Sequence, residues 1–348
     1  GITVNLAVLA NYKYVDFLID TVNKAFDLSY ALPGVLLPLA ISFFTFQQIA
    51  YLVDSYRRET SEYDVLRYAL FVTFFPQLIA GPIVHHREMM PQFGSPRSTV
   101  IRYPNILQGL FIFGVGLFKK VAIADTFALW AVAGFDGGNQ LDFFAAWATS
   151  LSYTFQLYFD FSGYCDMAIG AALLFNIRLP LNFNSPYKAL DIQDFWRRWH
   201  ITLSRFLRDY LYIPLGGNRG STGRTIVNIM ATFLLGGLWH GASWMFVVWG
   251  ALHGIAIITL RGWRSLRRPL PPAIAWLVTF LFVNISWVFF RAKNWDDAER
   301  VLLGMVDFES AAGLSIAAIP TAGLAWGGFL SDYLLQVLPN GFVPQVFS

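Results

Sequence analysis

The chain has 348 residues, of which 56% are hydrophobic and only 14% are charged, and its mean hydropathy is +0.49. A typical soluble domain has about 25% charged residues, so this composition excludes an ordinary soluble globular protein. The formal net charge of +3 fits basic loops beside membrane spans, and we assign the protein no nucleic-acid partner.

Apolar stretches long enough to cross a bilayer recur along the whole chain. A membrane-spanning helix needs about 20 mostly apolar residues, whereas a membrane strand needs about ten alternating ones. The stretches here are continuous, so we predict an all-α, polytopic membrane protein with one membrane domain over 1–348. The first residue is glycine, and we expect the sequence to begin inside a longer protein. The predicted spans lie near 32–53, 64–84, 104–124, 141–159, 161–177, 225–240, 244–260, 272–290 and 311–337, with a partial span near 2–20.

Two polar stretches, 85–103 and 178–224, interrupt the predicted spans. The second contains eight basic and three acidic residues, a net charge of +5. Basic loops favour the cytoplasmic side of a membrane, so we expect both stretches on or near that face.

Residues 191–211 have the pattern of an amphipathic helix. At about 100° per residue, aromatic and aliphatic side chains share one face, whereas arginines and aspartates share the other. We predict a helix in the membrane interface that begins after Asp191 and stops near Pro214, with His200 at the border between the faces. The arginines of this helix are candidates for holding the phosphates of a cytosolic donor such as coenzyme A; they are Arg197, Arg198, Arg205 and Arg208. Anchoring to membrane lipid is the alternative role.

His240 is the strongest candidate for proton transfer. It follows an apolar run and is flanked by Gly236, Gly237 and Gly241, which permit close backbone approach. Ionisable residues at membrane depth are costly and mark function by default, although a neutral histidine bonded to a neighbouring helix is the alternative. For His253, 13 residues further on, we predict structural packing.

Other chemistries have weaker support in the sequence. The five histidines show no zinc-binding spacing, no serine lies in a nucleophile elbow, and no Walker-type loop occurs, so we assign no metal. Asp160 and Asp166 are interpreted as inter-helix partners, and Cys165 as a buried span residue. The residues themselves leave two classes open: a membrane-embedded transferase, and a transporter that uses histidines and aspartates as a proton relay.

Six ordered blocks together resemble the membrane-bound O-acyltransferase family, in its alginate O-acetyltransferase branch. The resemblance covers nearly the whole chain. The blocks are LPLAISFFTFQQIAYLVDSYR (37–57), FFPQLIAGPIVHHREMMPQF (74–93), YFDFSGYCDMAIG (158–170), DFWRRWHITLSRFLRDYLYIPLGGNRG (194–220), GGLWHGASWMFVVWGALHG (236–254) and NISWVFFRA (284–292).

The resemblance implies a helical bundle around a transmembrane tunnel, with interfacial amphipathic helices. It implies that His240 is the catalytic histidine and that His200 occupies a second site position. The implied reaction transfers an acetyl group from a cytoplasmic donor, acetyl-coenzyme A, to an exported polysaccharide such as alginate. The resemblance also implies an extracytoplasmic acyltransferase partner, a bacterial inner-membrane location, further helices before this sequence and some further sequence after it. D-Alanyl transfer to teichoic acid remains the alternative within the family, and the transporter remains the alternative outside it.

Overall fold

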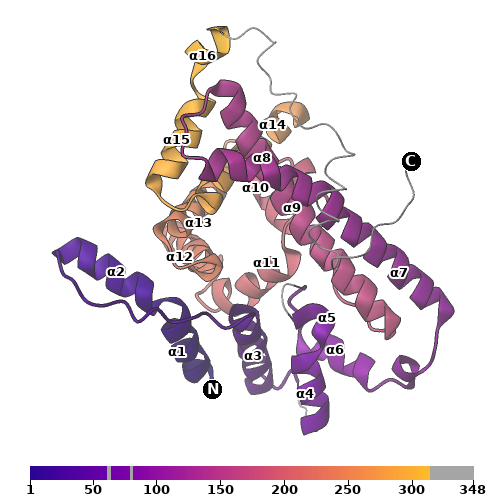
Figure 1. Ribbon diagram of the computed structural model, residues 1–348. Helices are drawn as coiled ribbons and strands as arrows, with labels where there is room; N and C mark the ends of the chain where they lie inside the picture. The colour runs from indigo at the N-terminus through magenta and orange to yellow at the C-terminus, as the bar shows by residue number, and fades with distance from the viewer. Residues whose placement is uncertain (61–63, 79–80, 314–348) are drawn as a thin grey trace, which may run out of the picture. The chain divides into compact units, whose positions relative to one another are not determined.

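The computed structural model describes residues 1–60, 64–78 and 81–313. These residues form helices and helical turns with no strand among them, which confirms the all-α class. Residues 1–306 form one compact unit, and the described part of a second unit (307–348) includes α16 (Phe308–Gly313). The helices of the first unit (Figure 1) are α1 (Ile2–Lys13), α2 (Val15–Phe26), α3 (Ile41–Tyr56), α4 (Val65–Thr73), α5 (Phe75–Leu78), α6 (His86–Phe93), α7 (Tyr103–Phe118), α8 (Asp125–Asp136), α9 (Phe143–Leu174), α10 (Ile192–Arg198), α11 (Ile201–Leu207), α12 (Thr222–His240), α13 (Trp244–Ser265), α14 (Pro272–Arg291) and α15 (Trp295–Met305).

Three helical stretches in the described part of the chain are long and apolar enough to cross a membrane. They are Tyr103–Asp136, in which a π-helical segment joins α7 to α8, and the helices α13 and α14. A fourth candidate combines α1 and α2, which are bent by 59° relative to each other. Apolar side chains on these helices are exposed, including Phe111 at 73%, as expected for surfaces that face lipid.

The helices differ from the predicted spans in three places. The stretches 141–159 and 161–177 form one 32-residue helix, α9, because Asp160 at the expected boundary pairs with Lys120 and stays helical. In the stretch 64–84, the described residues form two short helices, α4 and α5, because Pro76 lacks the N–H that would continue the α4 hydrogen-bond ladder. Helix α3 begins at Ile41, later than predicted. Most of the span predicted at 311–337 lies outside the described residues.

Helices α7 and α9 lie side by side and pack through glycines (Figure 1). A Cβ atom on Gly116 would lie 2.5 Å from the carbonyl oxygen of Gly163, and one on Gly109 would lie 2.7 Å from that of Gly170. Small residues let helix backbones approach closely where no water-driven hydrophobic force holds them together. This contact fixes α9, which carries one wall of the candidate site.

The predicted amphipathic helix over 191–211 is two helices with a break between them. Asp191 caps α10 by accepting a hydrogen bond from the Asp194 N–H at 2.8 Å, as predicted, and the last helical turn ends at Tyr212, before Pro214. His200 separates α10 from α11 with a left-handed φ of 42°, so the expected single polar face is interrupted there. The apolar face persists on both helices, where Phe195 and Leu203 are buried.

Candidate active site

His200 and His240 line the same cavity, which has a volume of about 270 Å³. The cavity lies between the end of α12, the start of α11, the middle of α9 and the segment around the start of α3. Its walls are mostly apolar, with few polar groups, as in many small-ligand sites. The lining residues are Lys13, Leu37, Pro38, Ala40, Ile41, Ser42, Phe43, Phe161, His200, Trp239 and His240.

His240 is the last residue of α12, and the chain becomes extended at Gly241. A Cβ atom on Gly241 would lie 2.1 Å from the Phe246 ring, so only glycine fits beside the histidine. Aromatic rings hold the imidazole, with ring centroids 5.1 Å away at Trp249 and 5.0 Å away at Phe290. No described residue hydrogen-bonds to the His240 ring, which leaves it available to a substrate.

His200 is 1% exposed and lies at the break between α10 and α11. Its Nδ1 lies 3.1 Å from Oδ1 of Asn182, and the Phe161 ring meets it edge to face at a centroid distance of 4.8 Å. Burial, with a smaller contribution from His240, lowers the pKa of His200 well below its ordinary value. The imidazole is therefore neutral in the resting protein.

Lys13 is a cavity residue that the sequence analysis missed. Its ammonium group hydrogen-bonds to the Trp239 carbonyl oxygen and to Ser42 Oγ, the latter at 3.0 Å. It also lies 5.7 Å from the centroid of the Trp239 ring. A lone lysine at the end of the first apolar run, in NYKY, was the only signal in the sequence. The cavity therefore holds the amino group of a lysine beside the two histidines.

A second cavity, of about 330 Å³, is lined by both apolar and cationic side chains, and we call it the cationic cavity. Its cationic lining residues are Arg208, Arg261 and Arg264. Its apolar lining residues include Leu207, Ile229 and Phe233. A chain of aromatic contacts connects this cavity to the one with the histidines. Trp196 lines the second cavity, and the centroids of the Trp196 and Trp249 rings lie 5.9 Å apart. Trp249 in turn contacts His240 of the first cavity.

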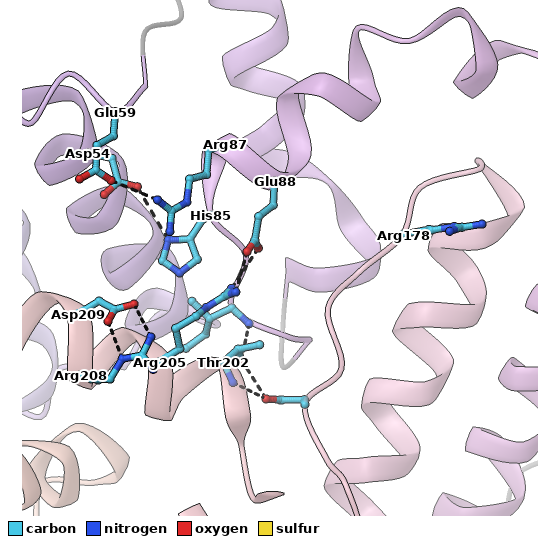
Figure 2. Close-up of polar contacts among 12 residues, drawn as sticks. Asp54, Glu59, His85, Arg87, Glu88, Arg178, Thr202, Arg205, Arg208 and Asp209 are labelled. Atoms are coloured by element: carbon cyan, nitrogen blue, oxygen red, sulfur yellow. Dashed lines mark hydrogen bonds and ion pairs between the residues drawn. The ribbon is translucent and has the colours of Figure 1, made fainter. Parts of the chain in front are cut away.

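The four arginines predicted to hold a donor have different surroundings. Arg205 makes a bidentate pair with Glu88 at 2.6 and 3.0 Å, and Arg208 pairs with Asp209 (Figure 2). Arg198 pairs with Asp194, and Arg197 is exposed. Of the four, only Arg208 lines the second cavity. The sequence analysis missed Arg261 and Arg264, which come from the end of α13, far along the chain.

A buried polar cluster joins the two polar stretches of the chain (Figure 2). Figure 2 shows His85 beside Asp54, with His85 Nδ1 3.9 Å from Asp54 Oδ2. The Tyr210 hydroxyl donates to Asp54 Oδ1 at 2.7 Å and lies 2.9 Å from His85 Nδ1. Burial is the main cause that lowers the pKa of His85. Together with the Arg205–Glu88 pair, this cluster attaches the segment around α6 to the π-helical turn at Arg208–Tyr212.

Several residues have the structural roles expected of them. His253 is fully buried, and its two ring nitrogens lie 3.2 Å from Trp196 Nε1 and 3.1 Å from Ser286 Oγ. Asp160 and Asp166 pair with Lys120 and Lys119 at 2.7 and 2.6 Å. Cys165 is 2% exposed within α9. These contacts confirm packing for His253 and inter-helix pairing for the two aspartates.

The chain belongs to the membrane-bound O-acyltransferase family, whose sequence model matches residues 52–294. It is 54% identical over 335 residues to a peptidoglycan O-acetyltransferase of Helicobacter pylori, a match that covers 88% of this chain and 64% of that protein. It is 44% identical to a probable alginate O-acetylase of Pseudomonas aeruginosa, over 96% of this chain and 65% of the relative. A teichoic acid D-alanyltransferase of Streptococcus thermophilus is 26% identical over 72% of this chain and 68% of its own length. The chain thus spans just under two thirds of the length of the first two relatives.

Proposed function

We propose that this protein is an integral-membrane O-acyltransferase that moves an acetyl group from a cytoplasmic donor, acetyl-coenzyme A, towards an exported polysaccharide. The observation that carries the proposal is the placement of His200 and His240 in one cavity, in a chain that belongs to an O-acyltransferase family. The proposed location is a bacterial inner membrane, and an extracytoplasmic acyltransferase partner is proposed to complete delivery to the polymer.

His240 is the proposed general base. Its neutral imidazole takes the proton of an acceptor hydroxyl while the hydroxyl oxygen bonds to the thioester carbonyl carbon. The carbon–sulfur bond then breaks, and the leaving thiolate of coenzyme A receives the proton from His240. The apolar walls of the cavity support this role, because they exclude water that would otherwise hydrolyse the thioester.

The cationic cavity is the proposed donor side. Guanidinium groups pair well with phosphate, and Arg208, Arg261 and Arg264 all line this cavity. Each already has a protein partner: Arg208 contacts Asp209, Arg261 contacts Asn218, and Arg264 contacts Asp191. A bound phosphate would share the three guanidinium groups with these partners. We therefore propose that Arg208, Arg261 and Arg264 bind the donor's phosphates. Arg205 is left out of this set because it pairs with Glu88.

Acetyl transfer is favoured over the two alternatives by separate observations. The two O-acetyl relatives are 54% and 44% identical to this chain, against 26% for the D-alanyl relative. A transporter relay would need its acids beside its histidines. Asp160 and Asp166 pair with lysines of the α7–α8 stretch instead.

Deletion of the gene tests the proposed function. We expect polymer from the deletion strain to lose alkali-labile acetate while the amount of exported polymer stays nearly unchanged, with mass spectrometry of polymer from both strains as the measurement. Loss of D-alanine instead of acetate would show that the protein is a D-alanyltransferase and not an acetyltransferase. Unchanged polymer would refute both transferase assignments.

A further inference from the structure

Asn182 lies in the segment between α9 and α10 and is 1% exposed. Its side-chain Oδ1 is within hydrogen-bond distance of three groups: the Thr202 N–H at 3.2 Å, the Thr202 hydroxyl at 2.9 Å and His200 Nδ1 at 3.1 Å. Its Nδ2 donates to Cys165 Sγ at 3.3 Å. Its backbone oxygen accepts from the Ile201 N–H at 3.0 Å. Asn182 therefore contacts His200 and the first two residues of α11, Ile201 and Thr202.

The orientation of the Asn182 amide follows from its partners. A backbone N–H can only donate, so the Asn182 atom that meets the Thr202 N–H is the oxygen and not the nitrogen. Thr202 agrees with this orientation, because its hydroxyl accepts from the Ile83 N–H at 2.9 Å and has its own proton left for Asn182.

The protonation of His200 follows in turn. Since Oδ1 of Asn182 is an acceptor, His200 Nδ1 must carry a proton to bond with it. A neutral imidazole has one proton, so Nε2 then carries a lone pair. Nε2 is buried and has no hydrogen-bond partner among the described residues, while His200 itself lines the cavity. A buried acceptor without a partner is costly, and a bound ligand would satisfy it.

We propose that Asn182 holds neutral His200 in the tautomer with its proton on Nδ1, so that Nε2 accepts a hydrogen bond from the acceptor substrate. Asn182 is a positioning residue, and His200 binds rather than donates. This inference deepens the proposed function and rests on it for the identity of the substrate. Because His240 takes the proton of the reacting hydroxyl, the group that meets His200 is a second O–H or N–H of the same acceptor.

The tautomer also limits what His200 does in the reaction. With a lone pair at Nε2, neutral His200 cannot donate a hydrogen bond to the oxyanion that forms at the thioester carbonyl. Lys13 of the same cavity has a side-chain nitrogen that can donate such a hydrogen bond. The other titratable groups near His200 are His240 across the cavity and Cys165 behind Asn182.

Nitrogen-15 NMR of the full-length protein, labelled at histidine, tests the tautomer without any substrate. The His200 signals are assigned by their loss in His200→Asn. At about pH 8, where an ordinary histidine is neutral, we expect the proton on Nδ1 and a lone pair on Nε2. A proton on Nε2 in the wild-type protein would overturn the inference.

Two variants separate positioning from mere support of the fold. Asn182→Asp keeps an oxygen acceptor for Thr202 and His200, but its carboxylate favours the imidazolium ion. We expect the pKa of His200, followed by the same NMR signals, to rise by at least about one unit, with a loss of polymer acetate in a complemented strain. Cys165→Ala removes the sulfur that Asn182 Nδ2 contacts and leaves the Oδ1 contacts with Thr202 and His200 in place, so the pKa of His200 and the acetate level should stay at wild-type values.

The outcomes distinguish this inference from the proposed function. An unchanged His200 pKa in Asn182→Asp would contradict the positioning role, whatever the polymer shows. If gene deletion left polymer acetate unchanged while the Nδ1 tautomer and the pKa rise were observed, the acyl-transfer proposal would fail. The control of His200 by Asn182 would then stand, without its acceptor role in acyl transfer.

Discussion

His240 and His253 lie on neighbouring helices, but their imidazoles have different surroundings. His253 is fully buried, and both of its ring nitrogens have hydrogen-bond partners. His240 faces the cavity, and among the described residues it has only ring contacts. His253 is built into the aromatic core between α10, α13 and α14, whereas the His240 imidazole is free to meet a substrate. The two histidines should therefore fail in different ways when they are removed.

We predict that His253→Ala lowers the midpoint of thermal unfolding by several degrees, whereas His240→Ala changes it little. Truncating His253 leaves a cavity and an unpaired Trp196 N–H, each of which costs on the order of 1–3 kcal/mol. The Ser286 hydroxyl loses its contact with His253 but keeps its hydrogen bond to the Val283 carbonyl oxygen. Fluorescence-monitored unfolding of the purified proteins in one detergent measures the difference. Equal midpoints for His253→Ala and the wild type would show that His253 is not a packing residue.

At the residue scale, the sequence indicated the candidate histidines but not what holds them. His240 was singled out by its apolar surroundings and flanking glycines, and the family resemblance added His200. Asn182 and Lys13 were missed, because Asn182 contacts a residue 18 positions later and Lys13 lies 226 positions from its Trp239 partner. Contacts at such separations are set by tertiary packing, which a local pattern does not record.

At the scale of elements, α9 positions the site through its contact with α7. The helix carries Phe161 of the cavity wall and Cys165 behind Asn182, and its glycines meet those of α7 at backbone distance. Hydropathy indicated apolar stretches on both sides of Asp160 but not their continuity, because the helix continues through an aspartate that Lys120 neutralises. The break at His200 was missed for a related reason: helical periodicity continued across it, whereas the contacts of Asn182 stabilise the left-handed residue.

A matched pair of glycine substitutions in α7 tests this helix contact. We expect Gly116→Ala to destabilise the protein, because its Cβ would lie 2.5 Å from the Gly163 carbonyl oxygen and 2.7 Å from the Met167 nitrogen. Gly114→Ala is the control: a Cβ there meets nothing within 4 Å, and alanine in a helix gains up to about 1 kcal/mol over glycine. Thermal unfolding of both variants gives the comparison. Equal stability of the two would mean that α7 and α9 do not pack as described.

On the scale of the whole molecule, the described chain brings two cavities to the same group of helices. The cavity with the histidines lies at the end of α12, and the cationic cavity lies along the middle of α12 and the last turns of α13. Composition and hydropathy were enough to predict an all-α membrane protein, which the structure confirms. They did not predict the cationic cavity, because Arg261 and Arg264 lie near the end of a span and match the pattern of ordinary flanking charges.

The central claim is that His240 performs acyl transfer in the shared cavity, and one measurement tests it most directly. A deletion strain is complemented with full-length wild type, His240→Ala or Gly114→Ala, and alkali-labile acetate on the exported polymer is measured at matched levels of membrane-inserted protein. Alanine keeps the end of α12 but supplies no proton acceptor, so His240→Ala should give the acetate level of the deletion strain, while Gly114→Ala should restore the wild-type level. Wild-type acetate with His240→Ala would contradict the account.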